Sequence, residues 1–247
     1  MTRPRTFPLL PVLISAFCAV IAARMAWREP RYLVPFLLIA AVTSVPAFLA
    51  RRRMKRLLMS GDVKTVIGTW QGSIERVMYP ETMAPLMVAT AYAAYGWIDA
   101  GRTALSRAVK GPAWEAALEQ RLFVETLLDT FEGDRLGALQ KASTLLTMPM
   151  PAGGMLAKKR IARLRRGIVA FARAFAHTSD AADARALKQA ASSSPLIHWA
   201  MRYASAVVAI DQGKKEEVPE LLAGAPSWPK ESAFRSFHEE LLTQAGS

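Results

Sequence analysis

The sequence predicts an all-α protein, in which an N-terminal transmembrane helical hairpin precedes an α-solenoid of helix hairpins. Two long apolar runs near the N-terminus predict the membrane hairpin. A hydrophobic content of 52% in 247 residues, with almost no alternation of β-branched residues, predicts helices nearly throughout. A glycine in a short polar turn recurs along the rest of the chain, which predicts that these helices form hairpins in series.

The two apolar runs extend over residues 7–23 and 32–50, and neither contains a charged residue. As helices they would be roughly 25 to 29 Å long, against about 30 Å for the hydrocarbon core of a bilayer. We therefore expect residues 1–56 to form a two-span membrane hairpin with a basic flank. The first run also has features of a cleaved signal peptide, and in that case the second run alone would remain as the anchor.

The charge distribution explains most of the formal net charge of +12. Residues 1–56 contain ten Lys and Arg against the single acid Glu29, so the rest of the chain is close to neutral. The largest basic cluster follows the second run, which predicts that both chain ends are cytoplasmic and the connector external. The composition, rich in Ala and Arg, is typical of bacterial proteins, so we expect the bacterial inner membrane.

Four turn motifs align in the remaining sequence, among them FEGDRLGALQKA at 131–142. Their glycines are Gly61, Gly101, Gly133 and Gly213, which are 40, 32 and 80 residues apart. Glycine ends helices by adopting the left-handed conformation without steric cost. The expected helices are a continuation of the second span through Met59, then 63–78, 82–98, 102–110, 113–131, 134–147, 156–176, 180–192, 195–211, 214–224 and 229–244.

The segment from Ala113 to Pro149 resembles a tetratricopeptide repeat, a helix-turn-helix unit of about 34 residues. The matching positions are Trp114, Leu118, Arg121, Leu122, Gly133, Ala138, Leu139, Ala142, Leu145 and Pro149. The resemblance implies that residues 57–247 form a tetratricopeptide-like (TPR-like) solenoid. We expect a break near 148–155, where Pro and Gly interrupt the helix, and a capping helix at 229–244.

The segment KKRIARLRRG at 158–167 is the densest basic cluster of this domain. At helical spacing, Lys159, Arg163, Arg166 and Arg173 lie opposite an apolar stripe. One interpretation is an ordinary solvated helix face. Another is contact with anionic lipid headgroups or an acidic partner. We do not expect nucleic acid as a ligand, because no aromatic residues alternate with the basic ones.

Solenoids present an extended concave surface to their partners, and aromatic residues on the first helices of the hairpins are candidates to line it. We expect Tyr92, Tyr95 and Tyr203 to contact a protein partner there. The other large aromatic residues are expected to fill the core of the hairpins.

The sequence contains no recognisable catalytic, cofactor-binding or metal-binding motif, so we expect no enzymatic activity and no cofactor. Cys18 is the single cysteine, and the three histidines are far apart in the chain. The predicted function is that of a membrane-anchored scaffold or assembly factor that binds a protein partner through its cytoplasmic repeat domain. The alternative is a subunit of a membrane transport or secretion complex, in which the two spans make the specific contacts.

Overall fold

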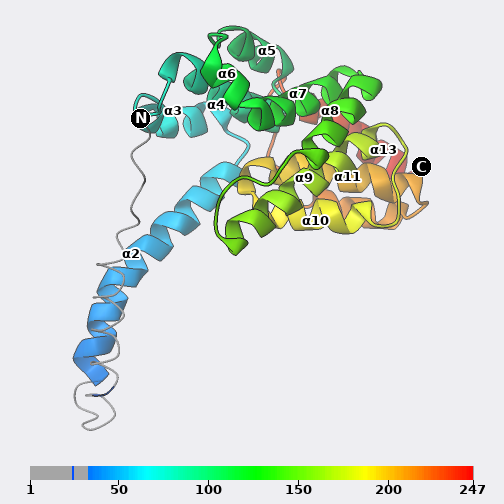
Figure 1. Cartoon of the computed structure of the whole chain (residues 1–247). Helices are drawn as coiled ribbons and strands as arrows, with labels where there is room; N and C mark the ends of the chain where they lie inside the picture. The colour runs from blue at the N-terminus through cyan, green and yellow to red at the C-terminus, as the bar shows by residue number, and fades with distance from the viewer. Residues whose placement is uncertain (1–23, 25–32, 247) are drawn as a thin grey trace. The chain divides into compact units, whose positions relative to one another are not determined.

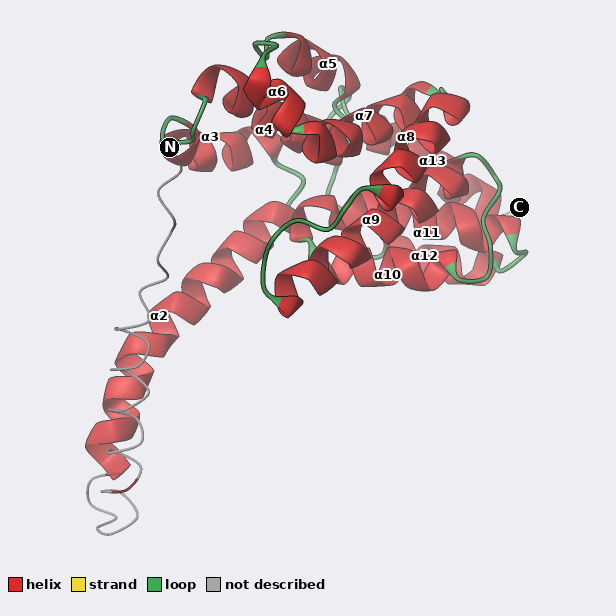
Figure 2. Ribbon diagram, viewed as in Figure 1, coloured by secondary structure: helices red, strands yellow, loops and turns green. Residues whose placement is uncertain are grey.

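The computed structural model describes residue 24 and residues 33–246, and every regular element in these residues is helical (Figures 1 and 2). Twelve α-helices pack against one another, which confirms the all-α fold and is compatible with a helical repeat. The chain divides into two compact units, Met1–Met54 and Lys55–Ser247. Each is described separately below.

The described part of the first unit belongs to α2 (Leu33–Met59). The first predicted span, 7–23, and Tyr32 at the start of the second lie outside the described residues. The side chains of Val42, Val45 and Phe48 on α2 are exposed. Among the residues that were described, no helix combines the length and the apolar character needed to cross a membrane.

The second unit is built from consecutive pairs of packed helices, with α4 against α5, α7 against α8, α9 against α10, and α11 against α12. The first helices of successive pairs also pack side by side, so the pairs form a series. The helices are α3 (Val63–Ile74), α4 (Pro80–Ala94), α5 (Ile98–Ser106), α6 (Pro112–Ala116), α7 (Leu118–Glu132), α8 (Arg135–Thr147), α9 (Met155–Phe175), α10 (Asp183–Ser193), α11 (His198–Asp211), α12 (Val218–Leu222) and α13 (Ala233–Gly246), with short 3-10 turns η2 (Pro195–Ile197) and η3 (Lys215–Glu217) before α11 and α12.

Residues with positive φ mark the turns of this series. Gly61, Gly133 and Gly213 adopt φ values of 80°, 87° and 72°, as predicted from their helix-ending positions. Gly96 has a φ of 71° in the turn of the α4–α5 pair, and His177 has a φ of 55° in the turn of the α9–α10 pair. The five turns are therefore 35, 37, 44 and 36 residues apart, a more regular period than the glycines alone indicated.

The predicted turn at Gly101 was wrong. Helix α5 begins at Ile98, so Gly101 lies inside this helix and is buried. A Cβ atom placed on Gly101 would lie 2.9 Å from Cδ2 of Leu128, because α5 and α7 pack closely at this point. The absence of a side chain here serves close packing between two helices rather than chain reversal.

The predicted helix ends at 78, 98 and 110 lie four residues beyond the ends of α3, α4 and α5, and two further boundaries differ for local reasons. The helix expected at 113–131 is divided into α6 and α7 at Ala117, where the backbone leaves helical geometry. The last helix begins at Ala233 rather than at residue 229, because Ser232 caps the segment by accepting a hydrogen bond from the amide of Phe234. The break near 148–155 is present as a non-helical connection between α8 and α9.

The C-terminal segment joins the first and last helix pairs of the second unit. The amide of Ala233 donates to the carbonyl of Gly96 at 2.9 Å, and Oγ of Ser232 donates to the carbonyl of Tyr95 at 2.6 Å. Helix α13 then packs against α11 and α12. Residues 137 positions apart in sequence are thus joined, which closes the series of helices at one side.

Candidate functional site

The tyrosines predicted to bind a partner belong to the core. Tyr95 and Tyr203 are 1% and 0% exposed, and Tyr92 is half-buried against Trp97, with ring centroids 5.9 Å apart. Burial raises the pKa of both Tyr95 and Tyr203. Because their rings are buried, Tyr95 and Tyr203 offer no surface to another protein. The predicted contact of these two residues with a partner was therefore wrong.

The hydroxyl groups of the two buried tyrosines hold distant segments together. Tyr95 donates to the carbonyl of Leu58 at 2.7 Å, in the last turn of α2. The Tyr203 hydroxyl accepts from Nε1 of Trp228 at 2.7 Å, and its ring stacks on Phe234 with centroids 4.7 Å apart. These contacts satisfy buried polar atoms, which stabilises the fold and leaves no free donor for a ligand.

Helix α13 covers aromatic side chains at the ends of the first helices. Phe234 and Phe237 contact Phe131 of α7, and Phe237 also contacts Phe175 of α9, with ring centroids between 5.3 and 5.9 Å apart. The aromatic side chains at the ends of α7 and α9 are therefore covered by the protein's own C-terminal helix.

The basic residues predicted on one face of α9 differ in their surroundings. Lys159, Arg163 and Arg166 are exposed and make no ion pair within the described part of the chain. Arg173 instead bridges Asp180 and Asp183, at 2.8 and 2.7 Å. Its role is to join α9 to the start of α10, so Arg173 is the one member of the predicted set that is not free for a ligand.

Arg165, which the sequence analysis did not single out, is the largest fully buried side chain of the protein. It donates to Oε1 of Glu119 at 2.9 Å and to the carbonyls of Met148 and Pro149. These bonds hold the connection between α8 and α9 against α7. A single buried Arg within a basic cluster cannot be distinguished from its exposed neighbours by composition.

The candidate binding site is a groove of about 530 Å³ along α11, here called the α11 groove. Its floor is made of small or apolar residues of α10 and α11, including Ala191, Ser205 and Val208. The full lining is Lys55, Met59, Ala184, Lys188, Ala191, Ser192, His198, Arg202, Ser205, Val208, Ala209, Gln212, Lys214, Glu217, Glu220 and Leu221. Spacing of three and four residues places one set of these side chains on a single helix face, namely positions 198, 202, 205 and 209 of α11 and the residue after its end, 212. This spacing could have been read from the sequence.

His198 lies in the part of the groove that Lys55 and Arg202 make basic. His198 lies against Ala191, whose carbonyl accepts from Nδ1 at 3.4 Å. Burial lowers the pKa of His198, and the positive charges of Arg202 and Lys55 lower it further. The imidazole is therefore neutral near pH 7, and a carboxylate placed beside it would favour its protonation.

Arg202 anchors one wall of the groove. Its guanidinium donates to the carbonyls of Glu220 and Leu221 near the C-terminal end of α12, and lies 5.6 Å from the centroid of the Trp199 ring. Nε1 of Trp199 in turn donates to the carbonyl of Met59 at 2.8 Å. Hydrogen bonds from α11 to the end of α2 and to α12 thus fix the positions of the segments that line the groove.

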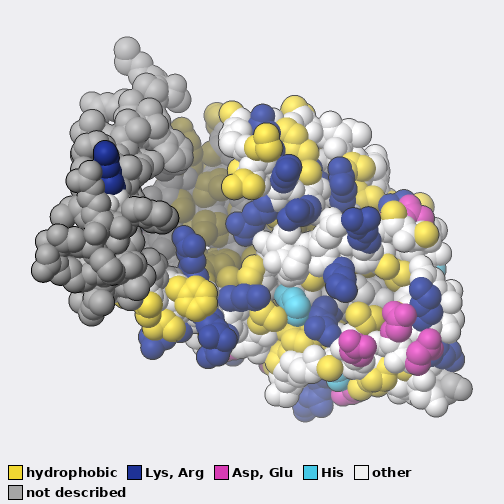
Figure 3. Space-filling view, turned by 90° about the horizontal axis from the view of Figure 1, so that it is seen from below, with side chains coloured by type: hydrophobic (Ala, Val, Ile, Leu, Met, Phe, Trp, Pro, Cys, Tyr) yellow, Lys and Arg dark blue, Asp and Glu magenta, His cyan; other side chains and the backbone are white. Residues whose placement is uncertain are grey.

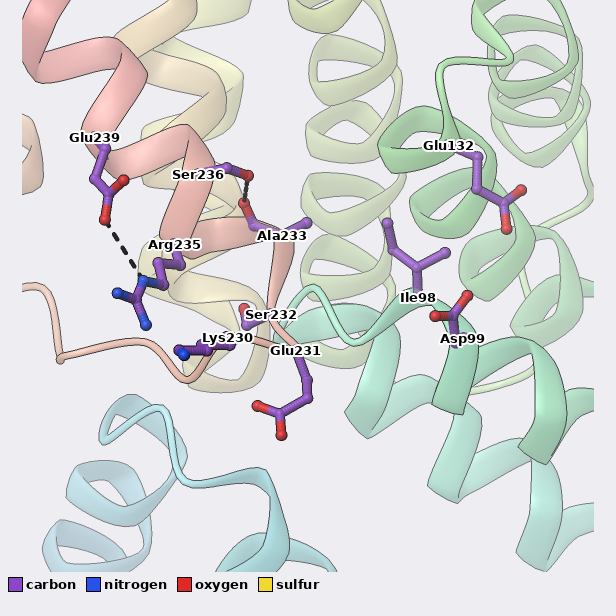
Figure 4. Close-up of a pocket in the computed structure, with 10 residues that line it drawn as sticks. All are labelled: Ile98, Asp99, Glu132, Lys230, Glu231, Ser232, Ala233, Arg235, Ser236 and Glu239. Carbon is purple, nitrogen blue, oxygen red and sulfur yellow. Dashed lines mark hydrogen bonds and ion pairs between the residues drawn. The ribbon is translucent and has the colours of Figure 1, made fainter.

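The face in Figure 3 shows Lys and Arg side chains spread widely, whereas Asp and Glu side chains gather at one side. A second cavity, of about 710 Å³, lies where the segment before α13 meets α5 and the end of α7 (Figure 4). It contains acids and bases together, and Glu132 is already bonded to Arg102 while Arg235 pairs with Glu239. This mixed lining favours neither anions nor cations.

No group of three or more His, Cys, Asp or Glu side chains in the described residues is arranged to hold a metal ion. Comparison with known proteins gave no match to any family model, curated protein or solved structure.

Proposed function

We propose that this protein is a membrane-anchored scaffold, whose TPR-like domain captures a segment of a protein partner at the cytoplasmic face of a bacterial inner membrane. The observation that carries the proposal is the α11 groove, because it combines small and apolar lining residues with a rim on which four Lys and Arg side chains outnumber two Glu side chains. Such grooves bind amphipathic segments of other proteins.

The membrane anchor is supported by the sequence of α2 and the residues that follow its apolar part. Residues 33–50 contain no charged side chain, and Val42, Val45 and Phe48 are exposed. Exposed apolar side chains along a helix favour an apolar environment. The basic residues between Arg51 and Arg56 then favour a cytoplasmic location for the domain that follows.

The partner that this groove fits is an amphipathic helix with carboxylates near one end. From His198 to Gln212, just past the end of α11, the groove lining extends over roughly 21 Å of helix. Lys55 and Lys188 line the groove and form no ion pair with any described residue. Acidic groups on the partner would complement these two charges and the imidazole of His198, which gives orientation and specificity.

Site-directed photocrosslinking of the full chain in its own membranes tests this function. A photoreactive residue in place of Ser192, in the groove, should crosslink one protein through an acidic segment. The same residue in place of Ser143, exposed on α8, should not. Lys55→Glu with Lys188→Glu should reduce the crosslink at least about tenfold, because two favourable charge contacts become repulsive.

The matched control is Arg107→Glu with Lys110→Glu, which reverses two exposed charges outside the groove and should leave the crosslink intact. Equal crosslinking from both positions, or no response to the groove charges, would contradict the scaffold proposal. Replacement of residues 1–50 by an unrelated two-span anchor separates the alternative function. Loss of the partner in that chimera would favour a membrane-complex subunit recognised through its spans.

A further inference from the structure

The beginning of α9 is exposed on all sides. Residues 151–160, which end the α8–α9 connection and form the first turns of α9, are all exposed. They include two large apolar side chains, Met155 and Leu156, which are 71% and 83% exposed. Exposing two adjacent apolar side chains to water is unfavourable, and such pairs frequently mark a contact surface.

These apolar side chains share one face of α9 with the basic residues. At about 100° per residue, Met155, Leu156, Lys159, Arg163 and Arg166 fall within a sector of about 100°. The buried stripe, which includes Ile168 and Phe171, lies on the far side of the helix. The five exposed residues are here called the α9 face.

The charges of the α9 face are uncompensated. Helix α9 contains no Asp or Glu, and none of the three basic residues of the face pairs with an acid among the residues described. Two other arginines of α9 do have acidic partners. Arg165 is buried and pairs with Glu119 of α7, and Arg173 pairs with Asp183 of α10. The face therefore offers three free cations next to two free apolar side chains.

We propose that the α9 face docks on an anionic lipid bilayer, with its cations at the headgroups and Met155 and Leu156 in the interface below them. Basic residues alone would suit any polyanion, but exposed apolar side chains beside them fit a lipid surface better than a nucleic acid. The proposal rests on the membrane location proposed above. It adds a second contact with the membrane, independent of the spans.

Vesicle binding by the fragment Lys55–Ser247 tests the α9 face without the spans. This fragment is a compact unit, and among the described residues those of the hydrophobic core lie between Leu57 and Ala245, so the fragment keeps that core intact. We expect flotation with vesicles of phosphatidylcholine mixed with phosphatidylglycerol, and none with phosphatidylcholine alone. Binding should weaken as salt rises, because the headgroup contacts are screened.

Two variants separate the charged and apolar contributions. Lys159→Gln, Arg163→Gln and Arg166→Gln together should weaken binding about a hundredfold, since each cation near an anionic leaflet contributes roughly fivefold. Met155→Ser with Leu156→Ser should weaken it about tenfold through loss of apolar burial. The control, Arg76→Gln, Arg107→Gln and Lys110→Gln, removes three exposed cations from the segments that follow α3 and α5 and should bind as the parent does.

Absence of binding to anionic vesicles would overturn the proposal, as would equal loss in the control, which would indicate a response to total charge. Insensitivity to the Met155 and Leu156 changes would also overturn it, because binding would then be a purely electrostatic response to a polyanionic surface. Alkaline extraction of the full chain from membranes tests the anchor separately. The fragment result and the extraction result can therefore fail independently.

Discussion

At the scale of single residues, neighbouring arginines in α9 have opposite roles. Arg165 is 2% exposed and satisfies Glu119 and two backbone carbonyls, whereas Arg166 is exposed and makes no ion pair with a described residue. Consecutive residues of a helix point in directions about 100° apart, so Arg165 faces the core whereas Arg166 faces solvent. The sequence RR carries no information about which is which.

This difference predicts unequal effects on stability. Arg165→Ala should lower the free energy of unfolding by about 3 kcal/mol, because it empties the space of a fully buried side chain and removes its hydrogen bonds to Glu119 and two backbone carbonyls. Arg166→Ala should change it by less than about 0.5 kcal/mol. Urea denaturation of the Lys55–Ser247 fragment measures both. Similar values for the two variants would contradict the structural role of Arg165.

At the scale of helices, glycine serves two purposes that the sequence does not distinguish. Gly133 ends α7 in the left-handed conformation, with a φ of 87°. Gly167 lies within α9 and allows close contact with α10, since a Cβ at this position would be 2.2 Å from Cβ of Ala190. Gly68, inside α3, faces open space.

Replacing Gly68 or Gly167 by alanine should therefore change the stability of the domain in opposite directions. Gly68→Ala should stabilise the domain by about 0.5 to 1 kcal/mol, because alanine favours helix and meets no neighbour. Gly167→Ala should destabilise it by about 1 to 3 kcal/mol, because the overlap with Ala190 forces α9 and α10 apart. Thermal unfolding of both variants compares them directly, and a gain in stability for Gly167→Ala would refute the close contact.

At the scale of the whole Lys55–Ser247 unit, the C-terminal segment makes the series of helix pairs a closed arrangement. Ser232 and Ala233 bond to the carbonyls of Tyr95 and Gly96, while Phe234 stacks on Tyr203 of α11. In an open repeat array, each pair contacts only its neighbours, so damage at one end remains local. Closure should couple the first and last pairs energetically.

Hydrogen exchange tests this coupling. Phe234→Ala should cost about 3 to 5 kcal/mol and should increase amide exchange both in α11 and in the distant turn around Gly96. Leu242→Ala, on the exposed side of the same helix α13, should leave both regions protected. Increased exchange confined to the C-terminal helices would indicate an open array instead.

The all-α fold, most helix boundaries and the turns at Gly61, Gly133 and Gly213 followed from the sequence, because helix periodicity and helix-ending glycines are local signals. The buried stripe of α9, with Ile168 and Phe171, followed for the same reason. The two-span anchor and the choice of partner remain predictions from composition and charge.

Tertiary structure alone decided which of the predicted site residues are accessible. Tyr95 and Tyr203 looked like candidates for a concave surface, but both are buried, and the C-terminal segment that packs on Tyr203 also bonds to the backbone of Tyr95, 137 residues away in sequence. The α11 groove likewise depends on tertiary packing, because residues of α10, α11 and α12 line it together. Local pattern fixes which face of a helix is apolar, whereas the segment that covers this face is chosen by contacts between residues far apart in the chain.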